Sequence, residues 1–142
     1  MDNNQLAFAL KNVKIYRGSF PRNAIPAPKK FPIAYIVNTD GVGEVGEHWV
    51  AIYFSRSGKC EYFDPFGFPP LHKDLLKFIN KHKVGPKFFY NSTTIQHSDT
   101  TLCGNYCIAF IKARSKGMSF KRFIGCFSNN LAVNGNRLKH FK

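Results

Sequence analysis

The sequence predicts an α+β domain with a mainly antiparallel sheet core, and three observations lead to this fold class. The nearly continuous apolar run "HWVAIYFS" (48–55) is rich in β-formers, as in a strand buried on both faces. A Ser-Gly turn signal and the alternating run "CEYFD" (60–64) follow it, which is the pattern of a hairpin. Residues 102–116 are apolar on several sides, as expected for an interior helix.

In the first third of the chain, residues 2–11 predict a short helix. Residues 17–32 are rich in proline and lack periodicity, so we expect an irregular arm there. The run "PIAYIVN" (32–38) predicts a strand, and the glycine-rich segment "TDGVGEVGE" (39–47) predicts a loop that leads into the buried strand.

Further along, residues 71–82 carry apolar side chains at helical spacing, and "KFFYN" (87–91) predicts another strand. Gly117 has the position of a C-terminal cap for the helix 102–116. The segment 119–130 begins on a serine cap and repeats phenylalanine and isoleucine at helical spacing, so we expect one more helix.

The length and composition suit one compact domain spanning residues 1–142. A hydrophobic share of 44% and an aromatic share of 15% allow a core and argue against disorder. The N-terminus has no signal-peptide pattern, and the longest apolar run, 49–54, is too short to span a bilayer. We therefore expect a protein that is neither secreted nor membrane-embedded, with its four cysteines kept as thiols.

The charge is strongly basic, because 21 Lys and Arg residues face eight Asp and Glu residues, for a net charge of +13. The basic residues are spread along the chain and do not form one tail. Such a surface favours polyanions, above all nucleic acid. A basic protein without a dedicated partner is the alternative that charge alone leaves open.

The stretch "TLCGNYC" (101–107) holds a candidate nucleophile. Cys103 lies where a helix is expected to start, and a helix N-terminus favours the thiolate. The polar residues 98–101 before it are of the kind that cap helices. Gly104 allows another segment to approach closely, and Cys107, one turn further along, is expected to point into the core.

His48 is the candidate base among five histidines, because it closes the glycine-rich loop and opens the buried strand. With a turn centred on Ser57–Gly58, residue 48 pairs near residue 67; with a wider loop centred on Arg56, it pairs with Asp64. Either register puts His48 and Asp64 at the same end of one hairpin. An acid beside a histidine orients the ring and stabilises its cation.

Gln96 can add an amide donor for a developing oxyanion.

Two alternatives use the cysteine pair differently. A zinc site would combine Cys103 and Cys107 with histidines, but C-x3-C is not the usual knuckle and no second pair has suitable spacing. A disulfide between them is poorer still, because neighbouring helical turns aim thiols badly at each other.

Taken together, "EHWVAIYF", "YFDPFGFP", a glutamine and "CGNYC" resemble the adenovirus protease (adenain) family of cysteine proteases, which is related to the proteases of ubiquitin-like proteins. The similarity runs from about Tyr16 to about Ala113. The resemblance implies a mixed, mainly antiparallel sheet packed on a central helix that carries the nucleophile at its N-terminus. Position by position, it also implies these roles: general base His48, orienting acid Asp64, oxyanion donor Gln96, nucleophile Cys103, and site support from Trp49 and Gly104.

The function implied by the resemblance is a cysteine endopeptidase that cleaves viral precursor proteins, beside glycine, during virion maturation. Such an enzyme would act as a monomer in the virion and in the nucleus of the infected cell. No prosthetic group or metal is implied. DNA or a viral peptide would stimulate it. The peptide would be held without a disulfide, because residues 65–95 contain no cysteine for a covalent link. The alternatives are a protease for ubiquitin or ubiquitin-like proteins and a basic nucleic-acid-binding virion protein.

Overall fold

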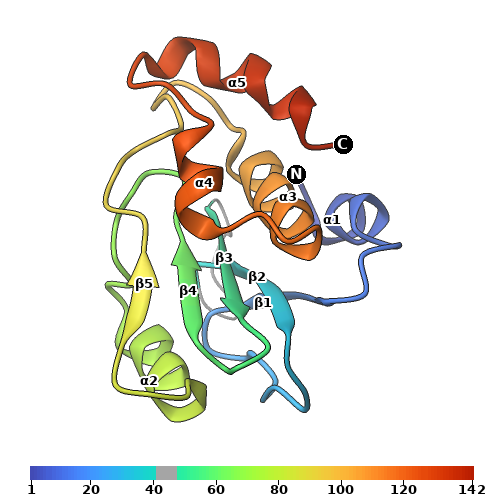
Figure 1. Ribbon diagram of the computed structural model, residues 1–142, viewed down its shortest axis with the longest axis vertical. Helices are drawn as coiled ribbons and strands as arrows, with labels where there is room; N and C mark the ends of the chain where they lie inside the picture. Colours follow the sequence, from blue (N-terminus) through green and yellow to red (C-terminus); the bar gives the residue numbers. More distant parts are fainter. Residues whose placement is uncertain (41–47) are drawn as a thin grey trace.

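The structure is a computed structural model that describes residues 1–40 and 48–142, so most of the predicted glycine-rich loop (39–47) lies outside the described residues. From the N-terminus the elements are α1 (Asn3–Ala9), β1 (Tyr16–Pro21), β2 (Ile33–Asn38), β3 (Trp49–Phe54), β4 (Cys60–Phe63), α2 (Lys73–His82), β5 (Phe88–Tyr90), α3 (Cys103–Ser115), α4 (Phe120–Gly125), the 3-10 helix η1 (Leu131–Val133), α5 (Asn134–Arg137) and the 3-10 helix η2 (Leu138–His140) (Figure 1).

The strands form one sheet in the order β1-β2-β3-β4-β5. The two central pairings, β2 with β3 and β3 with β4, are antiparallel, whereas β1 pairs parallel with β2 and β5 pairs parallel with β4. The α+β class and the mixed sheet agree with the prediction. The expected predominance of antiparallel pairing is wrong, because each outer strand returns to the sheet through a long connection and so runs parallel to its neighbour.

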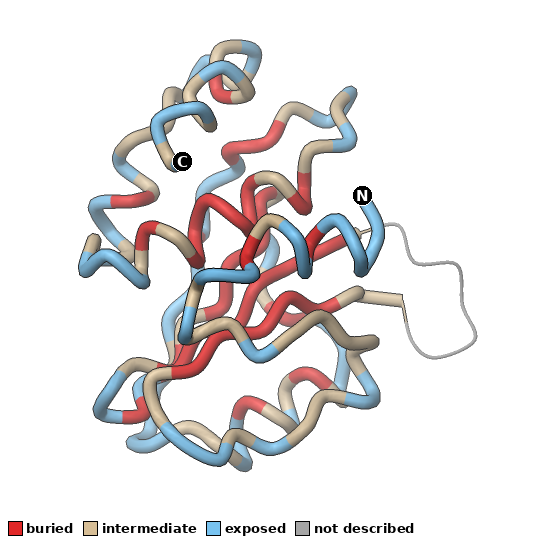
Figure 2. The backbone as a smooth tube through the Cα atoms, turned by 90° about the vertical axis from the view of Figure 1, so that its right-hand side faces the viewer, coloured by how far each residue is buried: buried red, intermediate tan, exposed pale blue. Residues whose placement is uncertain are grey.

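The sheet lies between helices on both faces. One face packs against α3, in a core that also includes Leu6 of α1 and Phe123 of α4. The other face packs against α2 through Leu75 and Ile79. Figure 2 shows the strands as a mostly buried layer in the middle of the molecule.

The central strand β3 is buried along its whole length, as its apolar run predicts. Alternate residues serve the two faces: Ala51 and Tyr53 belong to the core beneath α3, and Val50 and Ile52 to the core beneath α2. A strand with two buried faces needs apolar residues at every position, which explains the missing alternation.

The predicted irregular arm (17–32) is wrong over its first part, because residues 16–21 form β1. The strand pairs with β2 in an irregular register, with a shift between Tyr16 and Gly18. Phe20 packs edge-on against Tyr35 of β2, with ring centroids 6.1 Å apart. This non-local contact stabilises a strand that local sequence does not signal.

The helices mostly match their predicted ranges. Asp2 and Gln5 form a reciprocal capping box at the start of α1. The Ser119 side chain caps α4 by accepting from the Arg122 N–H, but α4 ends at Gly125, five residues before the predicted limit. Gly117 follows the end of α3 with φ +91°, as a C-terminal cap requires.

Within residues 1–40 and 48–142, no helix has the length and apolar character needed to cross a membrane.

Candidate active site

Three elements bring His48, Asp64 and Cys103 to one place. His48 directly precedes β3, Asp64 directly follows β4, and Cys103 is the first residue of α3. The hairpin register pairs Ala51 with Phe63, so Asp64 is level with Val50. This register lies between the two that the turn signals predict, and it keeps residues 48 and 64 on the same face.

The Asp64 carboxylate is held firmly against the His48 ring. The distance between His48 Nε2 and Asp64 Oδ1 is 2.8 Å, and the Phe66 N–H donates to the same oxygen at 2.8 Å. The Asp64 main chain is fixed by Asn91, whose Oδ1 accepts from the Asp64 N–H at 3.0 Å and whose amide donates to the Asp64 carbonyl. Asp64 is 4% exposed, so water competes little for its carboxylate.

The pKa of the His48 ring is raised, which favours the imidazolium at neutral pH. Burial alone lowers its pKa, but the hydrogen bonds with Asp64 and with Cys103, together with their negative charges, outweigh burial and raise the pKa to about 9. Since Nε2 is engaged by Asp64, Nδ1 is the ring nitrogen left to the thiol.

The Cys103 thiol shows the opposite shift. Burial raises its pKa, but the hydrogen bond with His48, the main-chain N–H groups of Trp49 and Gly104, and the His48 charge outweigh it, so the pKa lies below its ordinary value. A raised histidine pKa beside a lowered cysteine pKa favours a thiolate–imidazolium pair. Such a pair is chemically able to attack an electrophilic carbonyl.

Cys107 has a different environment. It is fully buried, as expected from its place one turn along α3, and its Sγ donates to the Trp49 carbonyl at 3.5 Å. Burial raises the pKa of this thiol well above its ordinary value. All four cysteines are free thiols, and within the described ranges no group of three or more His, Cys, Asp or Glu side chains is arranged to hold a metal ion.

Gln96 lies in the loop before α3 and is almost completely buried, at 1% exposed. Its N–H donates to the Pro65 carbonyl at 3.0 Å, so the turn after Asp64 helps to place it. Its side-chain Nε2 donates to the carbonyl and the hydroxyl of Thr100, each at 3.1 Å. Its Oε1 has no hydrogen-bond partner among the residues that the structure describes. The role of Gln96 as an oxyanion donor therefore stays a prediction.

Trp49 and Gly104 pack together beside Cys103. Trp49 is 7% exposed, and its indole N–H donates to the Met1 carbonyl at 3.0 Å. A methyl group on Gly104 would lie 3.0 Å from Met1 Sδ and 3.5 Å from Trp49 Cδ1. The close approach expected at Gly104 is thus made by Trp49 and by the N-terminal residue.

The start of α3 differs from the prediction in how it is capped. Leu102 occupies the cap position and makes no side-chain cap hydrogen bond, so capping by the polar residues 98–101 is wrong. The Thr100 hydroxyl instead accepts from Gln96 and donates to the His97 carbonyl at 2.9 Å. Thr100 thus helps to organise the loop that holds Gln96.

Two contributors to the site were not predicted from the sequence. Phe66 stacks on the His48 ring with centroids 4.8 Å apart and planes 23° apart. Asn91 fixes the Asp64 main chain from a segment 27 residues away. The "DPFG" turn was a signal for the first, since it places Phe66 next to the acid. The sequence carries no signal for the second.

Comparison with known proteins places the chain in a family. Residues 13–126 match the family model described as the adenovirus endoprotease. A SUMO-1 cysteine protease of African swine fever virus is 30% identical over 129 residues, which cover 79% of this chain and 45% of that protein. A protease of human adenovirus D serotype 17 is 29% identical over 117 residues, which cover 68% of this chain and 56% of that protein.

A solved structure of a viral protease is also similar to this chain. The crystal structure of an African swine fever virus protease superposes with a TM-score of 0.56 and 26% identity, over 77% of this chain and 44% of that chain. The chain spans about half the length of the curated relatives it matches. The resemblance expected from residues 16–113 is confirmed, and the chain belongs to the adenovirus endoprotease family.

Proposed function

We propose that the protein is a cysteine endopeptidase in which Cys103, His48 and Asp64 act as the catalytic triad. The observation that carries this proposal is the continuous hydrogen-bonded chain from the Cys103 thiol through the His48 ring to the buried Asp64 carboxylate. The opposite pKa shifts of the thiol and the imidazole are those that a cysteine nucleophile and its acid–base partner need.

In the proposed reaction, the Cys103 thiolate attacks the peptide carbonyl and forms a tetrahedral oxyanion. The His48 imidazolium then gives its proton to the leaving amine, the C–N bond breaks, and a thioester remains on Cys103. His48 next takes a proton from water, which attacks the thioester and releases the acid product and the thiolate. Asp64 holds the ring in position throughout.

We assign stabilisation of the oxyanion to the Gln96 side chain and the Cys103 N–H. A primary amide has two N–H donors. The two acceptors of Gln96 Nε2 both belong to Thr100, so one donor can serve both and leave the second for the oxyanion. Support comes from the fixed position of Gln96, because a pre-organised donor needs no reorganisation during the reaction.

The substrates we propose are viral precursor proteins cut beside glycine, within the virion and the nucleus of the infected cell. Membership of the adenovirus endoprotease family supports this substrate class. We further propose that the enzyme works as a monomer without a prosthetic group, and that DNA or a non-covalently bound viral peptide stimulates it. The net charge of +13 favours contact with DNA.

Hydrolysis of a ubiquitin-like protein is the second candidate. The observation that favours it is the similarity to the African swine fever virus relative, which is named a SUMO-1 cysteine protease. The same chemistry serves both candidates, because a ubiquitin-like tail and a glycine cleavage site both present an unbranched main chain to the nucleophile.

One labelling experiment tests the proposal and separates the two candidates. The same electrophile is placed at the C-terminus of a short Gly-Gly peptide and of intact SUMO-1, and each probe is incubated with the wild type, Cys103→Ala and His48→Ala. We expect rapid labelling of the wild type and none of Cys103→Ala. Labelling by the SUMO-1 probe much faster than by the peptide supports the second candidate. Unchanged labelling in both variants overturns the triad.

Nucleic-acid binding is tested separately with Cys103→Ala. We expect DNA affinity that falls steeply with salt and is the same in this variant as in the wild type. Loss of DNA binding in Cys103→Ala would contradict a DNA-binding surface that is separate from the active site.

A further inference from the structure

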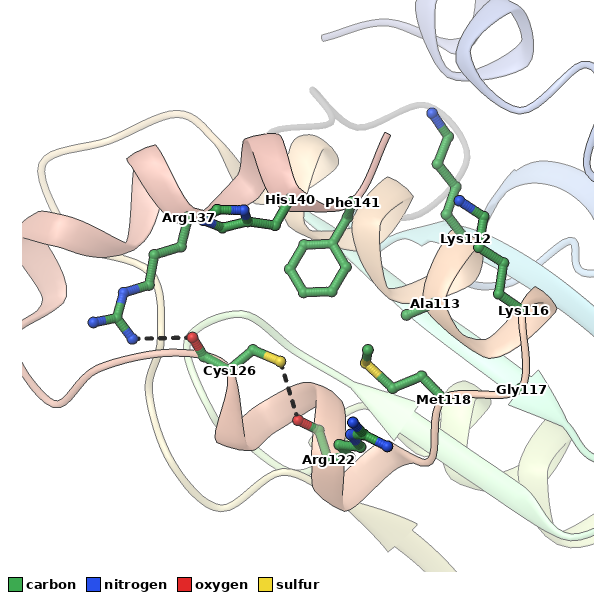
Figure 3. Close-up of a pocket in the computed structure, with 10 residues that line it drawn as sticks. All are labelled: Lys112, Ala113, Lys116, Gly117, Met118, Arg122, Cys126, Arg137, His140 and Phe141. Carbon is green, nitrogen blue, oxygen red and sulfur yellow. Dashed lines mark hydrogen bonds between the residues drawn. The ribbon is translucent and has the colours of Figure 1, made fainter.

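A pocket with a strongly basic rim lies between α3, α4 and the C-terminal segment, and it plays no part in the proposed reaction. Its volume is about 580 Å³, within the range of small-molecule sites. Lys112 and Lys116 line it from α3, Arg122 from α4, and Arg137 from α5. Figure 3 shows these side chains around the pocket, with Phe141 between them.

The positive charges of the rim are not balanced by acidic side chains. None of the residues that line the pocket is an aspartate or a glutamate. Arg137 donates to the Cys126 carbonyl at 3.0 Å, and Lys116 donates to the Lys142 main-chain oxygen at 2.8 Å. Lys112, Arg122 and Arg137 form no salt bridge with a carboxylate side chain among the described residues. Cations that gather without carboxylate side chains beside them create a potential that attracts an anion.

The interior of the pocket is apolar and contains an aromatic ring. Ala113, Met118 and Phe141 contribute apolar surface. The Phe141 ring is held in place by Phe123 and Phe127, with centroid distances of 5.1 Å and 5.8 Å. A ring fixed by its neighbours offers a preformed surface for a planar ligand group. The pocket therefore combines a place for negative charge with a place for a flat apolar group.

We propose that this pocket binds an organic polyphosphate of nucleotide size, with its planar ring against Phe141 and its phosphates held by cations of the rim, among them Lys112 and Arg122. Arginine side chains bind phosphate oxygens in pairs, and lysine adds a point charge. Several cations around one pocket suit a ligand with more than one phosphate. The limited volume of this half-open pocket favours a small ligand over a nucleic-acid duplex, which would contact exposed side chains along an extended surface.

The pocket is distinct from the candidate active site, although both use α3. Lys112 lies nine residues after Cys103 on the same helix, which corresponds to about 14 Å along the axis. A bound ligand would connect α3, α4 and α5, and would thereby hold the C-terminal segment 131–142 on the body of the protein. Binding to the folded state alone raises thermal stability.

Calorimetric titration with ATP, adenosine, inorganic tripolyphosphate and a short DNA duplex tests the proposal on the full chain. The pocket variant carries Lys112→Gln and Arg122→Gln. The matched control carries Lys29→Gln and Lys30→Gln, which remove the same charge from two exposed residues just before β2. We expect ATP to bind the wild type and the control alike, and the pocket variant at least about tenfold more weakly.

The ligand series separates the ring from the phosphates. We expect tripolyphosphate and adenosine each to bind more weakly than ATP, and Phe141→Leu to weaken ATP without affecting tripolyphosphate. ATP should also raise the melting temperature of the wild type but not of the pocket variant. Equal losses in both double variants, tripolyphosphate that binds as tightly as ATP, or duplex DNA that binds the wild type and the control more tightly than ATP and loses that affinity in the pocket variant would overturn the proposal.

Discussion

His48 and Asp64 are joined by a 2.8 Å hydrogen bond between Nε2 and Oδ1, although 16 residues separate them in the chain. The bond joins the two strands at the open end of one hairpin, so the sheet itself fixes the distance between the ring and the carboxylate. It also determines which ring nitrogen faces the thiol, because the Asp64 carboxylate takes Nε2 and leaves Nδ1 for Cys103. This contact is one of the causes of the raised pKa of His48, beside the contact with Cys103.

Asp64→Asn keeps the shape of the side chain and removes its charge, so this variant tests what the charge contributes to the site. The hydrogen bonds and the charge of Asp64 contribute to raising the pKa of His48 to about 9, so we expect that pKa to fall toward its ordinary value of 6.5. The kcat for peptide hydrolysis should fall roughly 10²-fold or more, because the ring loses the partner that orients it. NMR titration of His48 and steady-state kinetics measure the two effects.

The matched control for this variant is Asp99→Asn. Asp99 is an exposed acid that lies 3.7 Å from His97, so it makes a similar pair outside the site. We expect no change in kcat and none in the His48 pKa. A loss of activity in Asp99→Asn as large as that in Asp64→Asn would show that general charge, and not this hydrogen bond, governs the rate.

The pH dependence of hydrolysis should be bell-shaped. As pH rises through about 9, His48 loses the proton that the leaving amine needs, so kcat/KM should fall on the alkaline side. As pH falls through the lowered pKa of Cys103, the thiolate is protonated and the rate falls on the acid side. In Asp64→Asn the alkaline limb should move to lower pH. An alkaline limb that stays in place would mean that another group limits the rate.

The two cysteines of α3 should differ sharply in reactivity. The Cys103 thiol has a lowered pKa, whereas burial raises the pKa of Cys107 well above its ordinary value and shields it completely. We expect iodoacetamide at neutral pH to modify Cys103 rapidly, and Cys107 only after unfolding in denaturant. Peptide mapping by mass spectrometry identifies the modified residue. In His48→Ala, alkylation of Cys103 should slow because the thiolate loses its cation.

Local sequence patterns predicted the hairpin and α3 well. A buried strand has a strong compositional signal, and the run 48–55 marks β3 to within a residue or two. The strand β1 was missed because its stability comes from pairing with β2, which lies beyond a proline-rich segment. Turn signals alone also left the register open by a few residues, and only the packed sheet selects the one that pairs Ala51 with Phe63.

The candidate site shows the same division. Three residues of the site could be recognised in the sequence, because their side chains are of reactive types and they lie at the ends of predicted elements: His48, Asp64 and Cys103. Asn91 and Met1 could not be recognised in this way, because each acts through contacts that join distant segments: Asn91 with Asp64, and Met1 with the Trp49 indole. Residues of this kind have no local pattern, and only the folded chain reveals them.

The turn that follows Asp64 gives the last prediction, because Gly67 allows no side chain there. Gly67 has φ +81°, and a methyl group on it would lie 2.7 Å from the Thr93 carbonyl carbon and 2.8 Å from the Thr94 nitrogen. Both neighbours are main-chain atoms, which cannot rotate away as a side chain does. Gly67→Ala should therefore combine backbone strain with a steric clash and destabilise the fold by about 3 kcal/mol.

Gly85→Ala is the control, because Gly85 has a similar φ of +92° but nothing within 4 Å of the added methyl group. It should cost only about 1 kcal/mol, from the backbone alone. Urea unfolding monitored by Trp49 fluorescence gives both values. Gly67→Ala should also lower kcat, because the displaced turn carries the Pro65 carbonyl that accepts from Gln96. Equal destabilisation in the two variants would mean that the Thr93–Thr94 segment moves to accommodate the added methyl group.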